Sequence, residues 1–205
     1  MPYDPQRHHR RSTRYPGFDY TSPGPYFVTI CVQGFECLLG EVADWQMHPN
    51  AWGQIVEEAW PVLSQRFPHI ELDACVVMPN HFHAIIGIVE APPEENMRTG
   101  NEDEETSSLR TASGTGVVST PLRQPPLGSL GQIIAYFKHE TTKRINVQRD
   151  AAGSRFWQRN YYEHIIRNDA ELERIRTYIA TNPQRWDVDQ LHPNAAPNRF
   201  NRPQA

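Results

Sequence analysis

Apolar positions along the chain follow two different periods, which predicts a fold that mixes strands and helices. Runs rich in β-branched and aromatic residues predict strands, and apolar residues spaced three or four apart predict helices. The expected strands are residues 25–33, 69–78, 81–90 and 156–167, with a turn and a short strand within GFECLLGEV (34–42). The expected helices are residues 50–67, 127–147 and 168–183, with Asn50 and Ser129 as N-caps and Pro183 ending the last helix.

The order of these elements favours an α+β fold, a ferredoxin-like antiparallel sheet with helices packed on one face. Pro79 and Asn80 separate two apolar strands and are turn-forming residues, so they predict a tight hairpin. Acidic, Ser, Thr, Gly and Pro residues without a sustained period predict a flexible insertion. The expected organisation is a basic and aromatic arm (1–24), a folded domain (25–185) with the insertion at about 91–127, and an irregular tail (186–205).

Composition and charge change this picture only slightly. Hydrophobic residues make up 38% of the chain and 18 residues are proline, so part of the chain is expected to lie outside a packed core. The formal net charge is −4, but residues 90–106 alone carry −6, which leaves +2 on the remainder. Together with the basic arm, this balance permits a nucleic-acid partner without requiring one.

Several broad classes are disfavoured by the sequence. The three cysteines are odd in number and lack a CxxC spacing, which favours a reduced, cytoplasmic setting over a disulfide framework. The N-terminus lacks the apolar segment of a secretory signal, and the longest apolar run, AIIGIV (84–89), is too short to span a bilayer. The chain also has no Walker motif or dinucleotide fingerprint.

Two histidines interrupt an otherwise apolar stretch, VVMPNHFHAIIGI (76–88). Residues i and i+2 of a strand point to the same face, so His81 and His83 are expected to project together while Phe82 faces the core. Two neutral imidazoles can hold half of a divalent metal site. They can equally be half-buried polar residues at the end of a strand, because histidine commonly shows intermediate burial.

The last expected helix offers a third ligand. Tyr178 and Asn182 are four residues apart, so they share one helical face, and an amide oxygen suits Mg²⁺ or Mn²⁺. The alternative interpretation places Tyr178 in the core and makes Asn182 the end of a helix before Pro183.

These segments together resemble the HUH single-tyrosine transposases, and within them most closely the REP-associated tyrosine transposases. The motifs that carry the resemblance, in this order, are VVMPNHFHAIIGI, LGSLGQIIAYFKHETTKRIN, FWQRNYYEHIIRN and YIATNP, over about residues 25–185 without the insertion. The resemblance implies a ferredoxin-like fold, metal ligands at His81, His83 and Asn182, and a nucleophilic tyrosine at Tyr178. Insertion-sequence members of the family often carry Gln where this chain has Asn182.

The implied reaction is cleavage of single-stranded DNA near a hairpin by transesterification. The Tyr178 phenol would attack a backbone phosphate and form a 5′-phosphotyrosine, with Mg²⁺ or Mn²⁺ as cofactor. A reaction that conserves phosphoester bonds needs no ATP. A monomer and a homodimer both remain open, and the expected setting is cytoplasmic, at the nucleoid.

Binding of a single strand would use basic and aromatic side chains outside this centre. Candidate contacts are Arg14 in the arm and Lys138, Lys143, Arg144, Arg155, Trp157 and Arg159 in the domain. Each of these can instead be a solvated or core residue.

Other interpretations are retained beside the tyrosine transposase. Tyr161 and Tyr162 are alternative nucleophiles, although neither has an amide four residues later, and His164 lies on the same face as Tyr162. A histidine-triad nucleotide hydrolase would need a third histidine where this chain has Ile85. A non-catalytic, domesticated protein that holds DNA hairpins with the same fold is not excluded by the sequence.

Overall fold

A four-stranded antiparallel sheet lies at the centre of the computed structural model, which describes residues 19–89 and 128–198. Its strands are β1 (Gly24–Cys31), β4 (Ile70–Met78), β5 (His81–Ile88) and β6 (Tyr162–Ile165), in the order β4-β5-β1-β6. Helix α1 (Ala51–Arg66) connects the first two of these strands, and α2 (Leu130–Gln148) precedes the last. This is the ferredoxin-like arrangement expected from the sequence, and the α+β prediction is confirmed.

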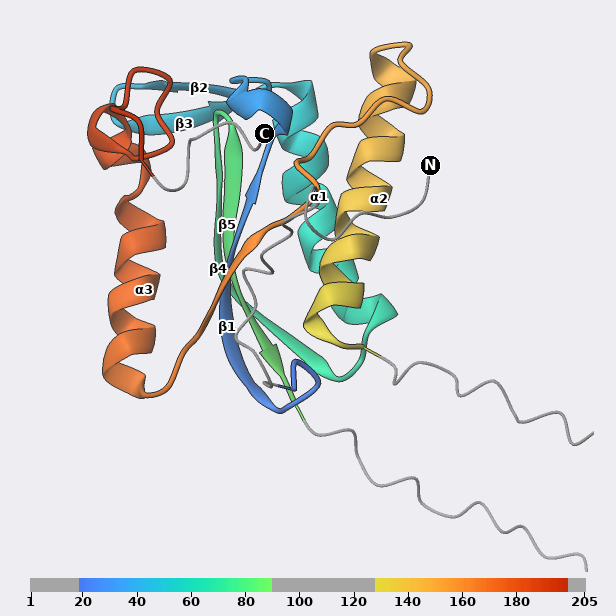
Figure 1. Cartoon of the computed structure of the whole chain (residues 1–205), viewed down its shortest axis with the longest axis vertical. Helices are drawn as coiled ribbons and strands as arrows, with labels where there is room; N and C mark the ends of the chain where they lie inside the picture. The colour runs from blue at the N-terminus through green and yellow to red at the C-terminus, as the bar shows by residue number, and fades with distance from the viewer. Residues whose placement is uncertain (1–18, 90–127, 199–205) are drawn as a thin grey trace, which may run out of the picture.

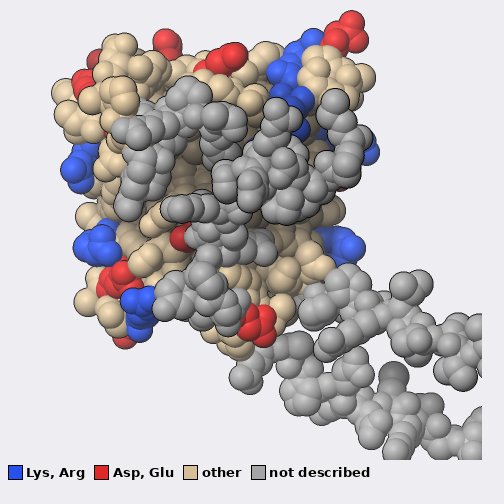
Figure 2. All heavy atoms as spheres, viewed as in Figure 1, with Lys and Arg blue, Asp and Glu red and all other residues tan. Residues whose placement is uncertain are grey.

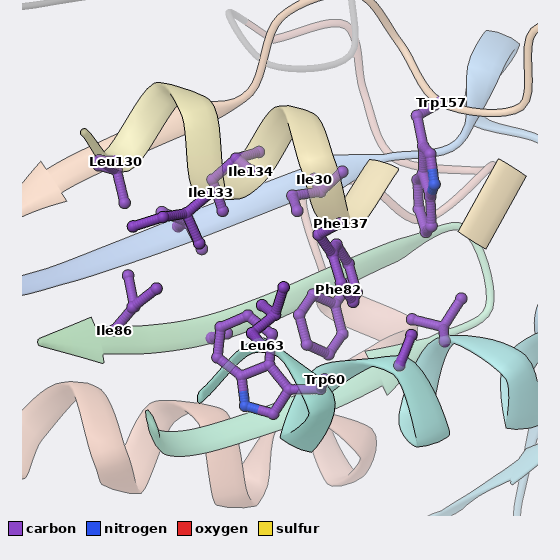
Figure 3. Close-up of a cluster of buried hydrophobic side chains, with 14 of the residues drawn as sticks. Ile30, Trp60, Leu63, Phe82, Ile86, Leu130, Ile133, Ile134, Phe137 and Trp157 are labelled. Atoms are coloured by element: carbon purple, nitrogen blue, oxygen red, sulfur yellow. The ribbon is translucent and has the colours of Figure 1, made fainter. Parts of the chain in front are cut away.

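Helices α1 and α2 pack side by side on one face of the sheet (Figure 1). The even-numbered residues of β5 point to this face, because side chains alternate along a strand. Figure 3 shows Phe82 and Ile86 of β5 meeting Trp60 and Leu63 of α1, with α2 closing the cluster from the other side. The α2 residues in this cluster are Leu130, Ile133, Ile134 and Phe137.

Helix α3 (Asp169–Thr181) covers the opposite face of the sheet, so the expectation that all helices share one face is wrong (Figure 1). A smaller apolar cluster of Phe27, Ile85, Ile166, Ile175 and Ile179 holds it there. The guanidinium of Arg176 also donates to the Asp73 carboxylate of β4, with Nε 3.0 Å from Oδ2. The odd-numbered face of β5 is apolar in part, and an antiparallel sheet with apolar residues on both faces needs cover on both.

The helix boundaries follow the predicted caps closely. The Asn50 side chain accepts hydrogen bonds from the backbone of Trp52 and Gly53 at the start of α1. Ser129 precedes α2, and its backbone N–H donates to the Gln132 side chain, as in a capping box. Helix α3 ends at Thr181, before Pro183.

Two strand predictions need correction. The segment 156–167 forms a strand only over Tyr162–Ile165, because Phe156 and Trp157 turn into the core and pair with the end of β1 only through one bridge to Val32. Trp157 is therefore a core residue and not an exposed DNA contact. The region after β1 contains a short helix η1 (Gln33–Phe35) and a separate hairpin, β2 (Gly40–Ala43) and β3 (Gln46–Pro49), instead of one short strand.

The described part of the tail, up to residue 198, is more ordered than expected. A 3-10 helix, η2 (Pro183–Val188), follows α3, and Trp186 and Leu191 are buried.

The predicted arm up to residue 18 and the insertion lie outside the described residues, as does Arg14. Within the described ranges, no helix is both long enough and apolar enough to cross a membrane. The three cysteines are unpaired.

Candidate metal and tyrosine site

The pairing register of β5 places the two histidines at one end of the sheet, beneath the C-terminal end of α3. His81 pairs with Cys31 of β1, and His83 pairs with Thr29. Both imidazoles are buried, and their ring centroids are 4.5 Å apart, so they project together as predicted. Phe82, between them, points into the α1 and α2 core.

Asn80 fixes the orientation of His81. The Asn80 amide nitrogen donates to the carbonyls of Phe35 and Leu191, which leaves its oxygen to accept from His81 Nδ1 at 2.8 Å. Because Nδ1 of His81 is thus the protonated nitrogen, Nε2 carries the free lone pair. That Nε2 is buried and has no hydrogen-bond partner among the described residues. It is the atom that a metal ion would use.

His83 lies between Thr29 and Tyr178. Its Nδ1 is 2.8 Å from Thr29 Oγ1, and its Nε2 is 3.2 Å from the Tyr178 hydroxyl. A hydroxyl can accept as well as donate, so Nδ1 can carry the proton and Nε2 can accept from the phenol. The ring of Phe27 stacks on His83 and meets Tyr178 edge-on, which holds both side chains in place. The predicted pair of histidine and tyrosine is therefore brought into direct contact.

Burial keeps both imidazoles neutral. Desolvation lowers the pKa of His81 well below its ordinary value, with the neighbouring His83 adding to the effect. Desolvation also lowers the pKa of His83 to about 3. A neutral imidazole presents a lone pair, which is the state that metal coordination requires.

Asp189 is a site residue that the sequence did not reveal. One oxygen of its carboxylate and one ring nitrogen each of His81 and His83 lie within 4.8 Å of one another. Burial raises the pKa of Asp189, whereas hydrogen bonds from Leu191 N–H and Asn182 lower it in part. Asp189 lies in the tail, where the sequence shows no motif. The tertiary structure brings it close to His81 and His83 of β5.

Asn182 closes the same site. It is 1% exposed, and both polar atoms of its side chain lack a hydrogen bond of regular geometry among the described residues. A buried amide whose contacts with Asp189 and Tyr178 are poorly formed hydrogen bonds costs free energy, so its presence here is consistent with an additional ligand. Two imidazole nitrogens, a carboxylate and an amide oxygen form a donor set that suits a divalent cation.

The phenol of Tyr178 is a weak nucleophile in this environment. Burial raises its pKa, the Asp189 carboxylate adds to that rise, and Asn182 and the Arg185 guanidinium oppose it. Positive charge is needed nearby before the phenolate is accessible at neutral pH. Arg185 is the nearby cation among the described residues that acts on both Tyr178 and Asp189.

The alternative tyrosines lie elsewhere. Tyr162 is on the neighbouring strand β6 and meets Phe27 edge-on, with centroids 6.5 Å apart. Tyr161 packs against the α1 and α2 core and lies beneath the Lys138 ammonium. His164 is engaged by the Glu171 carboxylate at 2.8 Å, so it supports the start of α3.

Three of the predicted basic DNA contacts, together with the buried Trp157, line one hollow of about 640 Å³ between α2 and residues 155–163. Lys138, Arg155 and Arg159 line it, whereas Lys143 is exposed elsewhere on α2. The Lys138 ammonium donates to the carbonyls of Gln158 and Asn160, so it holds this segment as well. Arg144 pairs with Glu58. Where described residues are visible in Figure 2, acidic and basic side chains are mixed.

Comparison with known proteins gives a sequence relative and two partial structural neighbours. No family model matches the chain. Two solved structures resemble it in part: a REP-associated tyrosine transposase bound to a REP hairpin (TM-score 0.44, 18% identity, 79% of this chain and 67% of that one), and a protein from Deinococcus radiodurans R1 (TM-score 0.42, 12% identity, 82% and 95%).

The sequence relative is an uncharacterised protein of Haemophilus influenzae Rd. It is 36% identical over 193 residues, which span 93% of this chain and 97% of that protein. The chain therefore belongs to the same family as this Haemophilus influenzae protein.

Proposed function

We propose that the protein is a metal-dependent tyrosine transposase of the HUH type, which cleaves and rejoins single-stranded DNA near hairpins. The observation that carries the proposal is the contact between the Tyr178 hydroxyl and His83 Nε2, 3.2 Å apart, beside the donor group of His81, His83 and Asp189. The proposed nucleophile and the proposed metal ligands come from different elements and lie in one partly buried group. The resemblance of the sequence motifs supports the same reaction.

His81, His83 and Asp189 are the proposed ligands, with the Asn182 amide as a further oxygen donor. Mg²⁺ or Mn²⁺ fits this set, because both accept carboxylate and amide oxygens and keep positions for water or phosphate. Such a cation, when bound, supplies the positive charge that lowers the pKa of the phenol and polarises a phosphate. The lone pair of His83 Nε2 cannot serve a metal and the phenol at once. The Tyr178 hydroxyl must therefore give up its hydrogen bond when Nε2 becomes a ligand.

The chemical step is a transesterification at one backbone phosphate. The Tyr178 oxygen forms a bond to phosphorus, and the bond from phosphorus to the 3′-oxygen breaks, so the phenolic proton is lost and the leaving strand ends in a 3′-hydroxyl. The other strand end remains on the protein as a 5′-phosphotyrosine. Reversal with a new 3′-hydroxyl rejoins DNA without an external energy source.

Single-stranded DNA carrying a hairpin is the proposed partner. Arg185 lies beside Tyr178 and would contact the scissile phosphate, while Arg155 and Arg159 at the α2 hollow would bind the strand further away. Lys138 positions the 158–160 segment, and Lys143 and Arg14 would add charge along the route. We propose a cytoplasmic, nucleoid-associated role as a monomer or homodimer.

The decisive variant is Tyr178→Phe. Wild-type protein, incubated with a hairpin-bearing single strand and Mn²⁺ or Mg²⁺, should form a covalent adduct that survives denaturing electrophoresis. Tyr178→Phe should reduce adduct formation by at least about 10³-fold, because loss of the nucleophile stops the chemical step. DNA binding should remain within about twofold, because the phenol contributes little charge to strand binding.

Controls separate the competing interpretations. Tyr162→Phe keeps Tyr178 and should keep the adduct, and duplex DNA or a chelator should abolish it. Persistence of the adduct in Tyr178→Phe would move the nucleophile to another tyrosine. A wild-type protein that binds hairpins but never forms an adduct would support the non-catalytic alternative.

A further inference from the structure

A second, smaller hollow adjoins the histidine site. It has a volume of about 290 Å³ and is lined by Val42, Asp44, Trp45, Pro183, Trp186 and Asp187. Its walls come from the β2–β3 hairpin and from η2, which lie next to each other at one end of the molecule (Figure 1). The ring of Trp186 is shared by both sites, because it also lies 6.1 Å from the His81 ring. A group bound in this hollow would therefore share the Trp186 ring with His81, a proposed metal ligand.

Trp45 is unusual in its exposure and in its backbone. It is 64% exposed, whereas Trp60, Trp157 and Trp186 are buried. Asp44 and Trp45 are the two connecting residues of the hairpin, and their φ angles are +49° and +64°. Turns with two positive φ angles favour Asn-Gly or Asp-Gly, and a bulky residue there is strained. The hairpin would be more stable with glycine at position 45, so folding does not explain this tryptophan.

The polar groups of the hollow select the chemistry of its occupant. Asp44 and Asp187 offer carboxylates, and no basic side chain is among its lining residues. Carboxylates repel phosphate but accept hydrogen bonds from amino groups on the edges of bases. An exposed indole supplies a stacking surface for a planar ring. The volume is below that of a site for a drug-sized ligand, which suits a single ring system.

We propose that this hollow binds one amino-bearing nucleobase of the strand that is cleaved, stacked on Trp45 and read by Asp44 and Asp187. This inference rests on the proposed function, because the strand is the one whose phosphate reaches Tyr178. Thymine lacks an exocyclic amino group and is therefore disfavoured. Selection of one base next to the scissile phosphate would fix where the strand is cut.

The test measures binding without cleavage. The full-length Tyr178→Phe variant serves as the parent protein. It is titrated with fluorescent oligo-dC, oligo-dA and oligo-dT, each about 12 nucleotides long. Trp45→Gly should weaken binding of oligo-dC or oligo-dA by about tenfold to hundredfold, the range expected for loss of one stacked base. Its melting temperature should stay equal or rise, because the turn strain is relieved. Trp45→Tyr should keep most of the affinity.

A second variant tests the reading of the base. Asp44→Asn combined with Asp187→Asn should reduce the preference for oligo-dC or oligo-dA over oligo-dT by about tenfold. Glu41→Gln, on the same hairpin but outside the hollow, should change neither affinity nor preference.

Two results overturn the inference: equal binding by Trp45→Gly and its parent, or no preference against oligo-dT in the parent. Neither result bears on whether Tyr178 forms the covalent adduct, so the proposed function is tested separately. A different outcome separates the two proposals. If Trp45→Gly loses affinity for the oligonucleotide but the wild type never forms the adduct, the proposed cleavage is overturned and the proposed base site is retained.

Discussion

The two faces of the central sheet differ in size and in chemistry. The face under α1 and α2 carries a large apolar cluster that includes Trp60, Phe82 and Phe137. Among the described residues, the face under α3 carries a smaller apolar cluster of five buried residues, and at one end it gives way to His81, His83 and Asp189. The same strand, β5, supplies side chains to both faces because its residues alternate.

This difference shows how the fold divides its tasks. Burial of apolar area on the α1 and α2 side provides most of the stabilisation, so the other side can hold polar groups that cost free energy when buried. The polar end is itself braced, since Asn80 ties His81 to the tail and Phe27 packs on His83.

The largest expected effect follows from truncating one residue on each face. Phe82→Ala should lower the free energy of unfolding by about 4 kcal/mol, because a large aromatic ring is lost from a closely packed cluster. Ile179→Ala should cost about 2 kcal/mol, since it removes fewer atoms and α3 can shift to fill the space. Urea denaturation of both variants measures the difference. Equal losses would show that the two faces contribute equally, and Phe82→Leu serves if the alanine variant does not fold.

Acid should affect the α3 face selectively. The pKa of His83 is lowered to about 3 and that of His81 lies well below its ordinary value, whereas both histidines take up protons near pH 6.5 when unfolded. The contribution of the two neutral histidines to the free energy of unfolding is therefore fully present above pH 6.5. It is lost as the pH falls toward the pKa values of the folded state. Protonation of His83 should cost about 2 kcal/mol between pH 6.5 and pH 5, and His81 should add to the loss in the same direction.

Urea denaturation of metal-free protein at pH 7 and pH 5 measures this loss. His83→Gln should remove about half of the pH dependence, and His139→Ala, which changes an exposed histidine, should leave it unaltered. A stability that does not change over this range would contradict the neutral, buried state of the pair.

The smallest effect concerns ion pairs on the two sides. Asp73→Asn breaks the contact that anchors α3 to β4 and should cost about 1 kcal/mol, because the pair is only partly exposed. Glu58→Gln breaks the more exposed pair with Arg144 on the other side and should cost close to nothing. Thermal melting at low and high salt compares the two. If Glu58→Gln lowered the melting temperature more than Asp73→Asn, the ion pair on the α1 and α2 side would be the stronger one, contrary to this prediction.

Local patterns determined the elements of the fold. The alternation in 69–90, the turn residues Pro79 and Asn80, and the caps Asn50 and Ser129 predicted the β4–β5 hairpin and the helix starts, because turns and caps depend on nearby residues. The strand predicted at 156–167 failed at Phe156 and Trp157. The aromatic side chains of this segment are buried in the α1 and α2 core, although the segment does not continue the β-sheet. Local sequence suits either arrangement, and tertiary packing decides between them.

For the site, the sequence determined which residues share a face, and the tertiary structure decided which faces meet. His81 and His83 follow from the period of a strand, and Tyr178 and Asn182 follow from the period of a helix. That α3 lies on the histidine face, and that Asp189 of the tail arrives beside them, depends on long-range packing of Ile175 and Leu191. Contacts between residues about a hundred positions apart leave no periodic signal in the chain, so they emerge only when the core closes.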